Sequence, residues 1–281
     1  MRRLLLFISF MFFIAYSCKK DEPTPYELAD GTRGGSLYNT FWDPQTGFDQ
    51  TNANLAKFKA KPDFFKCKQC HAWDREGNTA SYISRTPNAN RPRVAISINE
   101  IVKTYTPEKL FDATKTGTAP RRSVIADLTT YNPTTNFVEG DKMPNYSEIL
   151  TDGQIWDIVK FFKEEAFNVK DLYDYSTTGT YPTGKITYSN IGKNGNATRG
   201  KALFDSEGCA VQACHGAKGN AIKVDNATYT VGGFLRAKPN EAQHKIRFGQ
   251  NEDSGMFARE LNLQQMQDLY AALSDTLAFP K

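Results

Sequence analysis

A short internal repeat is the feature that most constrains the fold of this chain. Residues 32–38 read TRGGSLY and residues 198–204 read TRGKALF, so four of seven positions are identical and the last exchanges one aromatic ring for another. Each copy precedes a cysteine pair that ends in histidine, CKQCH at Cys67–His71 and CAVQACH at Cys209–His215. Repeats of this kind favour two similar units over one large domain.

The two copies share an order of predicted elements. A short helix is predicted at residues 107–117 in the first copy and at 239–249 in the second, each running from a proline to a glycine. A methionine follows each helix, Met143 in the first copy and Met256 in the second. We therefore expect each copy to read helix, cysteine pair with histidine, helix, methionine and helix.

A final amphipathic helix is predicted in each copy. Thr151 and Gln154 have the spacing of a capping box, and Asn262 and Gln265 repeat that spacing. Apolar residues follow at helical intervals in both places. The sequence therefore predicts that one helix begins after Thr151 and another after Asn262.

The pentapeptide Cys67-Lys68-Gln69-Cys70-His71 has the order that attaches a c-type haem. Two thiols add to the two vinyl groups on one edge of the porphyrin, and the next residue offers an imidazole nitrogen to the iron. The alternatives are a disulfide, a thioredoxin-like redox pair and a zinc knuckle. No βαβ pattern supports the redox pair, and a zinc site of four cysteines leaves both adjacent histidines unexplained.

The second pair, Cys209 and Cys214, has four intervening residues instead of two before His215. A disulfide is the main alternative here, because oxidised pairs are common outside the cytoplasm. The surrounding repeat favours a second haem.

The histidine count limits the iron ligands. The chain has three histidines, and two haems use His71 and His215, which leaves only His244. Two bis-histidine irons are therefore impossible, so a sixth ligand is methionine, another group or nothing. A thioether binds iron and raises the reduction potential relative to histidine.

The N-terminus predicts export. Two arginines precede a short apolar run and a small residue stands before Cys18, so residues 1–17 are expected to be a signal peptide. The order Ala-Tyr-Ser-Cys resembles a bacterial lipobox, which implies a lipidated Cys18, a tether over residues 18–31 and an outer-membrane lipoprotein. An uncleaved anchor and plain secretion are the alternatives. Removal of the two arginines lowers the net charge from +4 to +2.

Each copy resembles a class I cytochrome c domain. The motifs that carry the resemblance are CKQCH, ALFDSEGCAVQACHG, HKIRFGQ, KMPNYSEILTDGQIWDIVKFF and LNLQQMQDLYAAL. The resemblance implies an all-α fold of two tandem cytochrome c-like domains at residues 32–170 and 196–281, joined by a linker at 171–195. It also implies that the terminal helices of each domain cross, with close approach at Gly34 and Gly200, and that Tyr38 and Phe204 pack on Trp156 and Tyr270.

The same resemblance implies the site residues. Four cysteines (Cys67, Cys70, Cys209 and Cys214) would hold two covalent haem c groups, with His71 and Met143 on one iron and His215 and Met256 on the other. His244 is a rival distal ligand for the second iron. Arg247 would pair a haem propionate, and Lys115 is its weaker counterpart in the first copy. The sequence departs from the family in the Cys209–Cys214 gap, in Ala72 where glycine is usual and in Phe257 where proline is usual.

These features predict a two-haem electron carrier, rather than an enzyme, that works between other redox proteins of the cell envelope. The lipid anchor would attach the protein to the membrane. No basic stripe in the sequence indicates a nucleic-acid partner. The alternative is a haem-dependent oxidoreductase or peroxidase with an openable sixth position at the second haem. A third reading is a sensor lipoprotein in which haem detects a small ligand.

Overall fold

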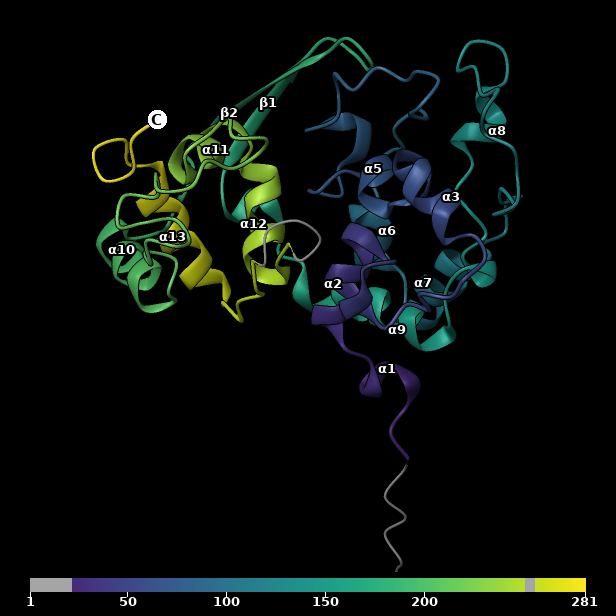
Figure 1. The fold of residues 1–281 in the computed structure, drawn as a ribbon, viewed down its shortest axis with the longest axis horizontal. Helices are drawn as coiled ribbons and strands as arrows, with labels where there is room; N and C mark the ends of the chain where they lie inside the picture. Colours follow the sequence, from purple (N-terminus) through teal and green to yellow (C-terminus); the bar gives the residue numbers. More distant parts are fainter. Residues whose placement is uncertain (1–21, 251–255) are drawn as a thin grey trace, which may run out of the picture.

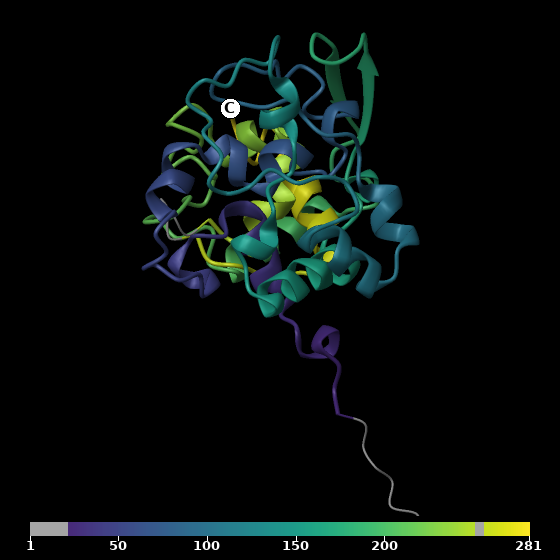
Figure 2. The same cartoon turned by 90° about the vertical axis from the view of Figure 1, so that its right-hand side faces the viewer.

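The computed structural model describes residues 22–250 and 256–281. In this described part, thirteen α-helices and one two-stranded sheet form two lobes that lie side by side (Figure 1). Figure 2, a quarter turn away, shows the first lobe in front of the second. The predicted signal peptide and Cys18 lie outside the described residues.

The first lobe takes residues 22–170. Its helices are α1 (Pro25–Leu28), α2 (Gly31–Thr40), α3 (Leu55–Ala60), α4 (Pro62–Phe65), α5 (Cys67–His71), α6 (Asn99–Thr104), α7 (Pro107–Lys115), α8 (Phe137–Asp141) and α9 (Asp152–Lys160). Helix α9 continues as one π-helical turn, η4 (Phe161–Glu165).

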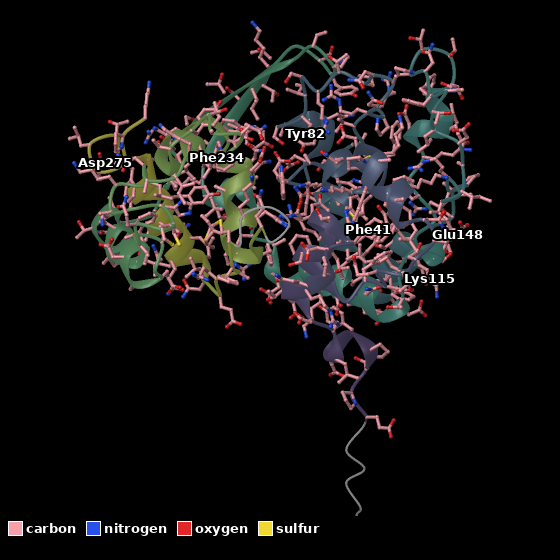
Figure 3. All side chains as sticks on the ribbon, in the orientation of Figure 1. Phe41, Tyr82, Lys115, Glu148, Phe234 and Asp275 are labelled. Carbon is pink, nitrogen blue, oxygen red and sulfur yellow. The ribbon has the colours of Figure 1, made fainter. Side chains whose placement is uncertain are left out.

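The second lobe follows the hairpin. Its helices are α10 (Ala197–Ser206), α11 (Val231–Ala237), α12 (Pro239–Phe248) and α13 (Leu263–Ser274). The short helices predicted at 107–117 and 239–249 are confirmed as α7 and α12. Each lobe has its own apolar core, and Figure 3 labels Phe41 within the first lobe and Phe234 within the second.

The prediction of an all-α chain is wrong. Strands β1 (Asp174–Thr178) and β2 (Lys185–Ser189) pair antiparallel, with Tyr175 opposite Tyr188, in the stretch expected to be a linker. Alternate side chains of β2 are half-buried, as a strand with one packed face requires. The hairpin runs along the top of Figure 1 from the second lobe to the first, where the Val94 backbone N–H donates to the Tyr181 hydroxyl at 2.9 Å. It therefore connects the lobes physically as well as in sequence.

The close helix approach predicted at Gly34 is confirmed. A Cβ on Gly34 of α2 would lie 1.9 Å from the backbone oxygen of Asp157 in α9. The Asp157 carboxylate accepts from the Asp30 backbone N–H at 2.7 Å and from Arg33 Nε at 2.6 Å. This carboxylate therefore binds the start of α2 and fixes the crossing.

The second lobe repeats this crossing. A Cβ on Gly200 of α10 would lie 1.8 Å from the backbone oxygen of Asp268 in α13. The Asp268 carboxylate accepts from the Asn196 backbone N–H at 2.7 Å and from Arg199 Nε at 2.7 Å. The sequence repeat is thus also a repeat of one helix-crossing geometry.

Both predicted capping boxes are present. The Thr151 side chain accepts from the Gln154 backbone N–H and the Gln154 side chain accepts from the Thr151 N–H, and Asn262 and Gln265 do the same. The predicted ring packing of Tyr38 on Trp156 is not found. Tyr38 packs on Phe161, with ring centroids 5.3 Å apart, while Trp156 lies in a separate apolar cluster.

Helix α12 forms a second contact between the lobes. Gly35 of α2 faces the ring of Phe248 so closely that a Cβ would lie 2.3 Å from it. Ser36 Oγ donates to the Phe248 carbonyl at 3.3 Å, and Gln243 Nε2 donates to the Phe167 carbonyl at 3.3 Å. The lobes therefore share a packed and hydrogen-bonded boundary.

None of the helices in residues 22–250 and 256–281 is both long and apolar enough to cross a bilayer.

Candidate functional site

The first cysteine pair forms a helix of its own. Cys67 to His71 make up α5, and Ala72 ends it with φ 63° and ψ 168°. This backbone region is nearly restricted to glycine. The Tyr38 hydroxyl donates to the Ala72 carbonyl at 2.5 Å, which holds the chain in the sharp turn after His71.

The structure brings the predicted residues of the first site to one cavity. Its lining includes both cysteines, His71, Met143 and Tyr146. Met143 comes from the loop before α9, more than seventy residues away in sequence. The cavity is therefore lined both by α5 and by the loop that carries Met143.

Burial sets the protonation of this site. It raises the pKa of Cys67 to about 11 and that of Cys70 to about 12, so both thiols are neutral at pH 7. It lowers the pKa of His71 to about 4, so the imidazole is also neutral. His71 Nδ1 is buried without a hydrogen-bond partner. A neutral imidazole with an available lone pair is the form that binds a metal.

The donor set fits a c-type haem. Two thiols, one neutral imidazole and one thioether face the same space, and a porphyrin iron takes only its axial ligands from the protein. The cavity holds about 60 Å³, room for a few water molecules. A macrocycle would need more space than this, so the side chains that line the cavity would have to shift to admit it.

The sequence analysis did not single out Tyr146, which lines this cavity, or Arg122, which bonds to the backbone of Phe64 in its lining. Tyr146 donates from its hydroxyl to the Phe65 carbonyl at 2.6 Å, and the Cys67 Sγ lies 3.6 Å from the same hydroxyl. The guanidinium of Arg122 is buried and donates to the Phe64 carbonyl at 2.6 Å. The only signal in the sequence was a pair of arginines in the loop that leads to Met143.

The second cysteine pair lies on a tight loop at the end of α10. The His215 backbone N–H donates to the Cys209 carbonyl at 3.1 Å, and that of Cys214 donates to the Val211 carbonyl at 2.8 Å. Cys209 is partly buried, whereas Cys214 is exposed. All four cysteines in the described part are free thiols, so the disulfide alternative is not formed here.

His215 shares one property with His71. Its Nδ1 is buried without a hydrogen-bond partner, and burial lowers the pKa of the ring. Its ring centroid lies 6.4 Å from that of Phe204, the last residue of the repeated heptapeptide. The imidazole is therefore neutral and positioned by the core of the second lobe.

Met256 is held near the end of α12. The Gln250 backbone N–H donates to the Met256 carbonyl at 2.8 Å. Residues 251–255, just before it, lie outside the described part, and Phe257 after it is 66% exposed. None of the described contacts joins Met256 to His215, whereas His71 and Met143 line one cavity.

His244 faces the first lobe. It is 3% exposed, and its ring centroid lies 4.8 Å from that of Trp73, 5.9 Å from that of Tyr38 and 5.7 Å from that of Phe161. Burial and neighbouring cations, Lys68 first among them, hold the pKa of His244 well below its usual value. These contacts place the ring in the boundary between lobes, and none of them is with His215.

Both predicted propionate partners are engaged elsewhere. Arg247 pairs with Glu165 of the first lobe at 2.7 Å, and its guanidinium lies 4.3 Å from the ring centre of Phe167. Lys115 pairs with Asp152 at 2.7 Å on the surface. Arg247 therefore contributes to the boundary between the lobes.

Within the described residues, no three His, Cys, Asp or Glu side chains gather as a bare metal ion requires. No family model, curated protein or solved structure matches this chain.

Proposed function

We propose that this chain is an exported electron carrier with two covalently attached c-type haems. The observation that supports it is the shared cavity of Cys67, Cys70, His71 and Met143. Bound there, a haem would exchange one electron between Fe(III) and Fe(II).

The protein residues around the first site have separate tasks. The two cysteines would hold the group covalently, so that it could not dissociate after export. His71 and Met143, which line the same cavity, would supply the imidazole nitrogen and the thioether sulfur to its iron. Phe64 and Tyr146 line the cavity and would place ring surface against the bound group, which would help to insulate it.

The second site supports the same role through Cys209, Cys214, His215 and Met256. A second candidate function, a haem-dependent oxidoreductase or peroxidase, is favoured by two observations there. Cys214 is exposed, and no described contact joins Met256 to His215. An iron without a retained sixth ligand can bind a small substrate.

The export signal and Cys18 support attachment to a membrane by lipid, with the outer membrane as the proposed location. The partners proposed are other redox proteins of the envelope, with no nucleic acid.

The test is to express the full chain in a host that matures c-type cytochromes, and to measure its mass and its ferric spectrum. We expect two covalent haems, both low-spin with a methionine–iron charge-transfer band. A high-spin fraction that binds cyanide rapidly would favour the oxidoreductase. A protein without covalent haem would refute both.

A further inference from the structure

A second cavity, lined by α6 and η4, shares no residue with the cavity at the first cysteine pair. It holds about 200 Å³, room for roughly six or seven water molecules. Its lining contains three cations, Arg75, Lys103 and Lys163, and apolar side chains that include Val102 and Phe162. None of the described residues that line it carries a carboxylate. The cavity therefore combines positive charge with apolar surface.

Arg75 is the buried cation of this cavity. It is 4% exposed, and of its guanidinium nitrogens only Nη2 has a hydrogen-bond acceptor among the described residues, with the Phe167 carbonyl at 2.8 Å as the nearer one. Asp74 and Glu76 act on its charge, but neither forms an ion pair with it in the described part of the chain. A buried cation normally has a counter-ion, because it has lost its hydration. Since Arg75 lines the cavity, its guanidinium is available to an anion bound there.

Lys163 is held at the same cavity by backbone carbonyls. Its Nζ donates to the carbonyls of Val102 and Tyr105, both at 3.0 Å. An ammonium has three N–H donors, so one remains for a ligand. Lys163 and Phe162 belong to the π-helical turn η4, a geometry that is frequent at functional sites. The side chain of Lys103 also lines the cavity and is 57% exposed, so the cavity reaches the surface.

We propose that this cavity binds a small organic carboxylate with a short apolar chain. The guanidinium nitrogens of Arg75 that lack an acceptor would donate charge-assisted hydrogen bonds to the carboxylate, and the third N–H of Lys163 would add another. The apolar chain would lie against Val102 and Phe162. The bound carboxylate would be the counter-ion that Arg75 lacks. The site uses neither the cysteines nor their histidines, so this inference does not rest on the proposed function.

The experiment measures the binding of butyrate to the purified full chain by titration calorimetry. Butyrate has about six non-hydrogen atoms, which matches the volume of the cavity. We expect a Kd of about 1 mM. We expect 1-butanol, which lacks the charge, and sulfate, which lacks the apolar chain, to bind at least roughly tenfold more weakly. Butyrate should also shift the NMR signals of the Val102 methyl groups.

The Arg75→Gln variant tests the buried cation. It should weaken butyrate binding by at least roughly tenfold, because the charge-assisted hydrogen bonds are lost. Arg236→Gln is the matched control in the second lobe, since Arg236 also donates to backbone carbonyls, those of Leu273 and Phe279. It should leave the Kd within about twofold of the wild-type value.

Two further variants test the cavity even if Arg75→Gln does not fold. Ala166→Leu places a larger side chain in the lining and should abolish butyrate binding. Lys163→Met should weaken binding by roughly three- to tenfold, whereas Lys160→Met should leave it unchanged. Lys160 is the matched control, because it also donates to a backbone carbonyl, that of Glu27, but does not line the cavity.

Two results would overturn the assignment of this site. One is butyrate binding that is no tighter than that of 1-butanol or sulfate. The other is butyrate binding that stays at the wild-type strength in Ala166→Leu and in Lys163→Met.

Discussion

Replacing Gly34 by alanine should destabilise the protein although alanine is the better helix former. The new Cβ would lie 1.9 Å from the Asp157 backbone oxygen, about 1.5 Å short of ordinary contact, which begins near 3.4 Å. Helices α2 and α9 must therefore separate, and the bonds from Asp30 and Arg33 to the Asp157 carboxylate would lengthen. Overpacking of this kind lowers the free energy of unfolding by about 3 kcal/mol. The higher helix propensity of alanine raises it by about 1 kcal/mol.

The net loss is therefore about 2 kcal/mol, or roughly 4–8 °C in melting temperature. Gly153→Ala is the matched control, because its Cβ would meet nothing closer than 3.9 Å, and it should stabilise by up to about 1 kcal/mol. Thermal unfolding followed by circular dichroism, with urea midpoints as a check, measures both. If Gly34→Ala proved as stable as Gly153→Ala, the helix crossing described here would be wrong.

Three further changes test other parts of the molecule. Cys67→Ala should lower the number of haems held by two thioether bonds by one, which mass spectrometry after proteolysis detects; an unchanged count would remove this residue from the site. Burial raises the pKa of Asp74 to about 6, so its ionised form destabilises the fold above that pH, and the penalty disappears as pH falls to its unfolded value of 3.8. Relative to Asp74→Asn, the wild type should therefore lose about 3 kcal/mol of stability between pH 4 and 7, and parallel urea-midpoint curves for the two proteins would contradict this. Glu165→Gln should cost about 2 kcal/mol because it leaves the largely buried Arg247 without its carboxylate, whereas Glu100→Gln, in an exposed pair, should cost under about 0.5 kcal/mol; equal urea midpoints would exclude a role for the first pair.

The parts of the fold that depend on neighbouring residues could be predicted from sequence. The capping boxes at Thr151 and Asn262 involve residues three positions apart, and both are present. The repeated heptapeptide located both helix crossings, because the glycine that permits the approach lies inside the repeat.

The parts of the fold that depend on contacts between distant residues could not be predicted from the sequence. Strand β1 has little apolar alternation, and the alternation in β2 involves only Ile186 and Tyr188. The packing of the hairpin against the first lobe involves Tyr181 and Val94, which are far apart in sequence. The family resemblance placed Arg247 beside a haem propionate, but in the structure its guanidinium forms an ion pair with Glu165 of the other lobe. Arg122 carries no motif, and only the structure shows that it is buried.

The way α12 serves both lobes limits how the chain can be divided. His244 and Phe248 belong by sequence to the second copy, yet they complete the aromatic cluster around Tyr38 and Phe161 of the first. A fragment that stops before residue 196 would lack His244 and Phe248 and would expose the rings of Tyr38 and Phe161 to water. We expect such a fragment to self-associate. Although the sequence carries an internal repeat, the two copies are not independent. If either were deleted, another surface would have to bury the aromatic side chains that the remaining copy leaves exposed.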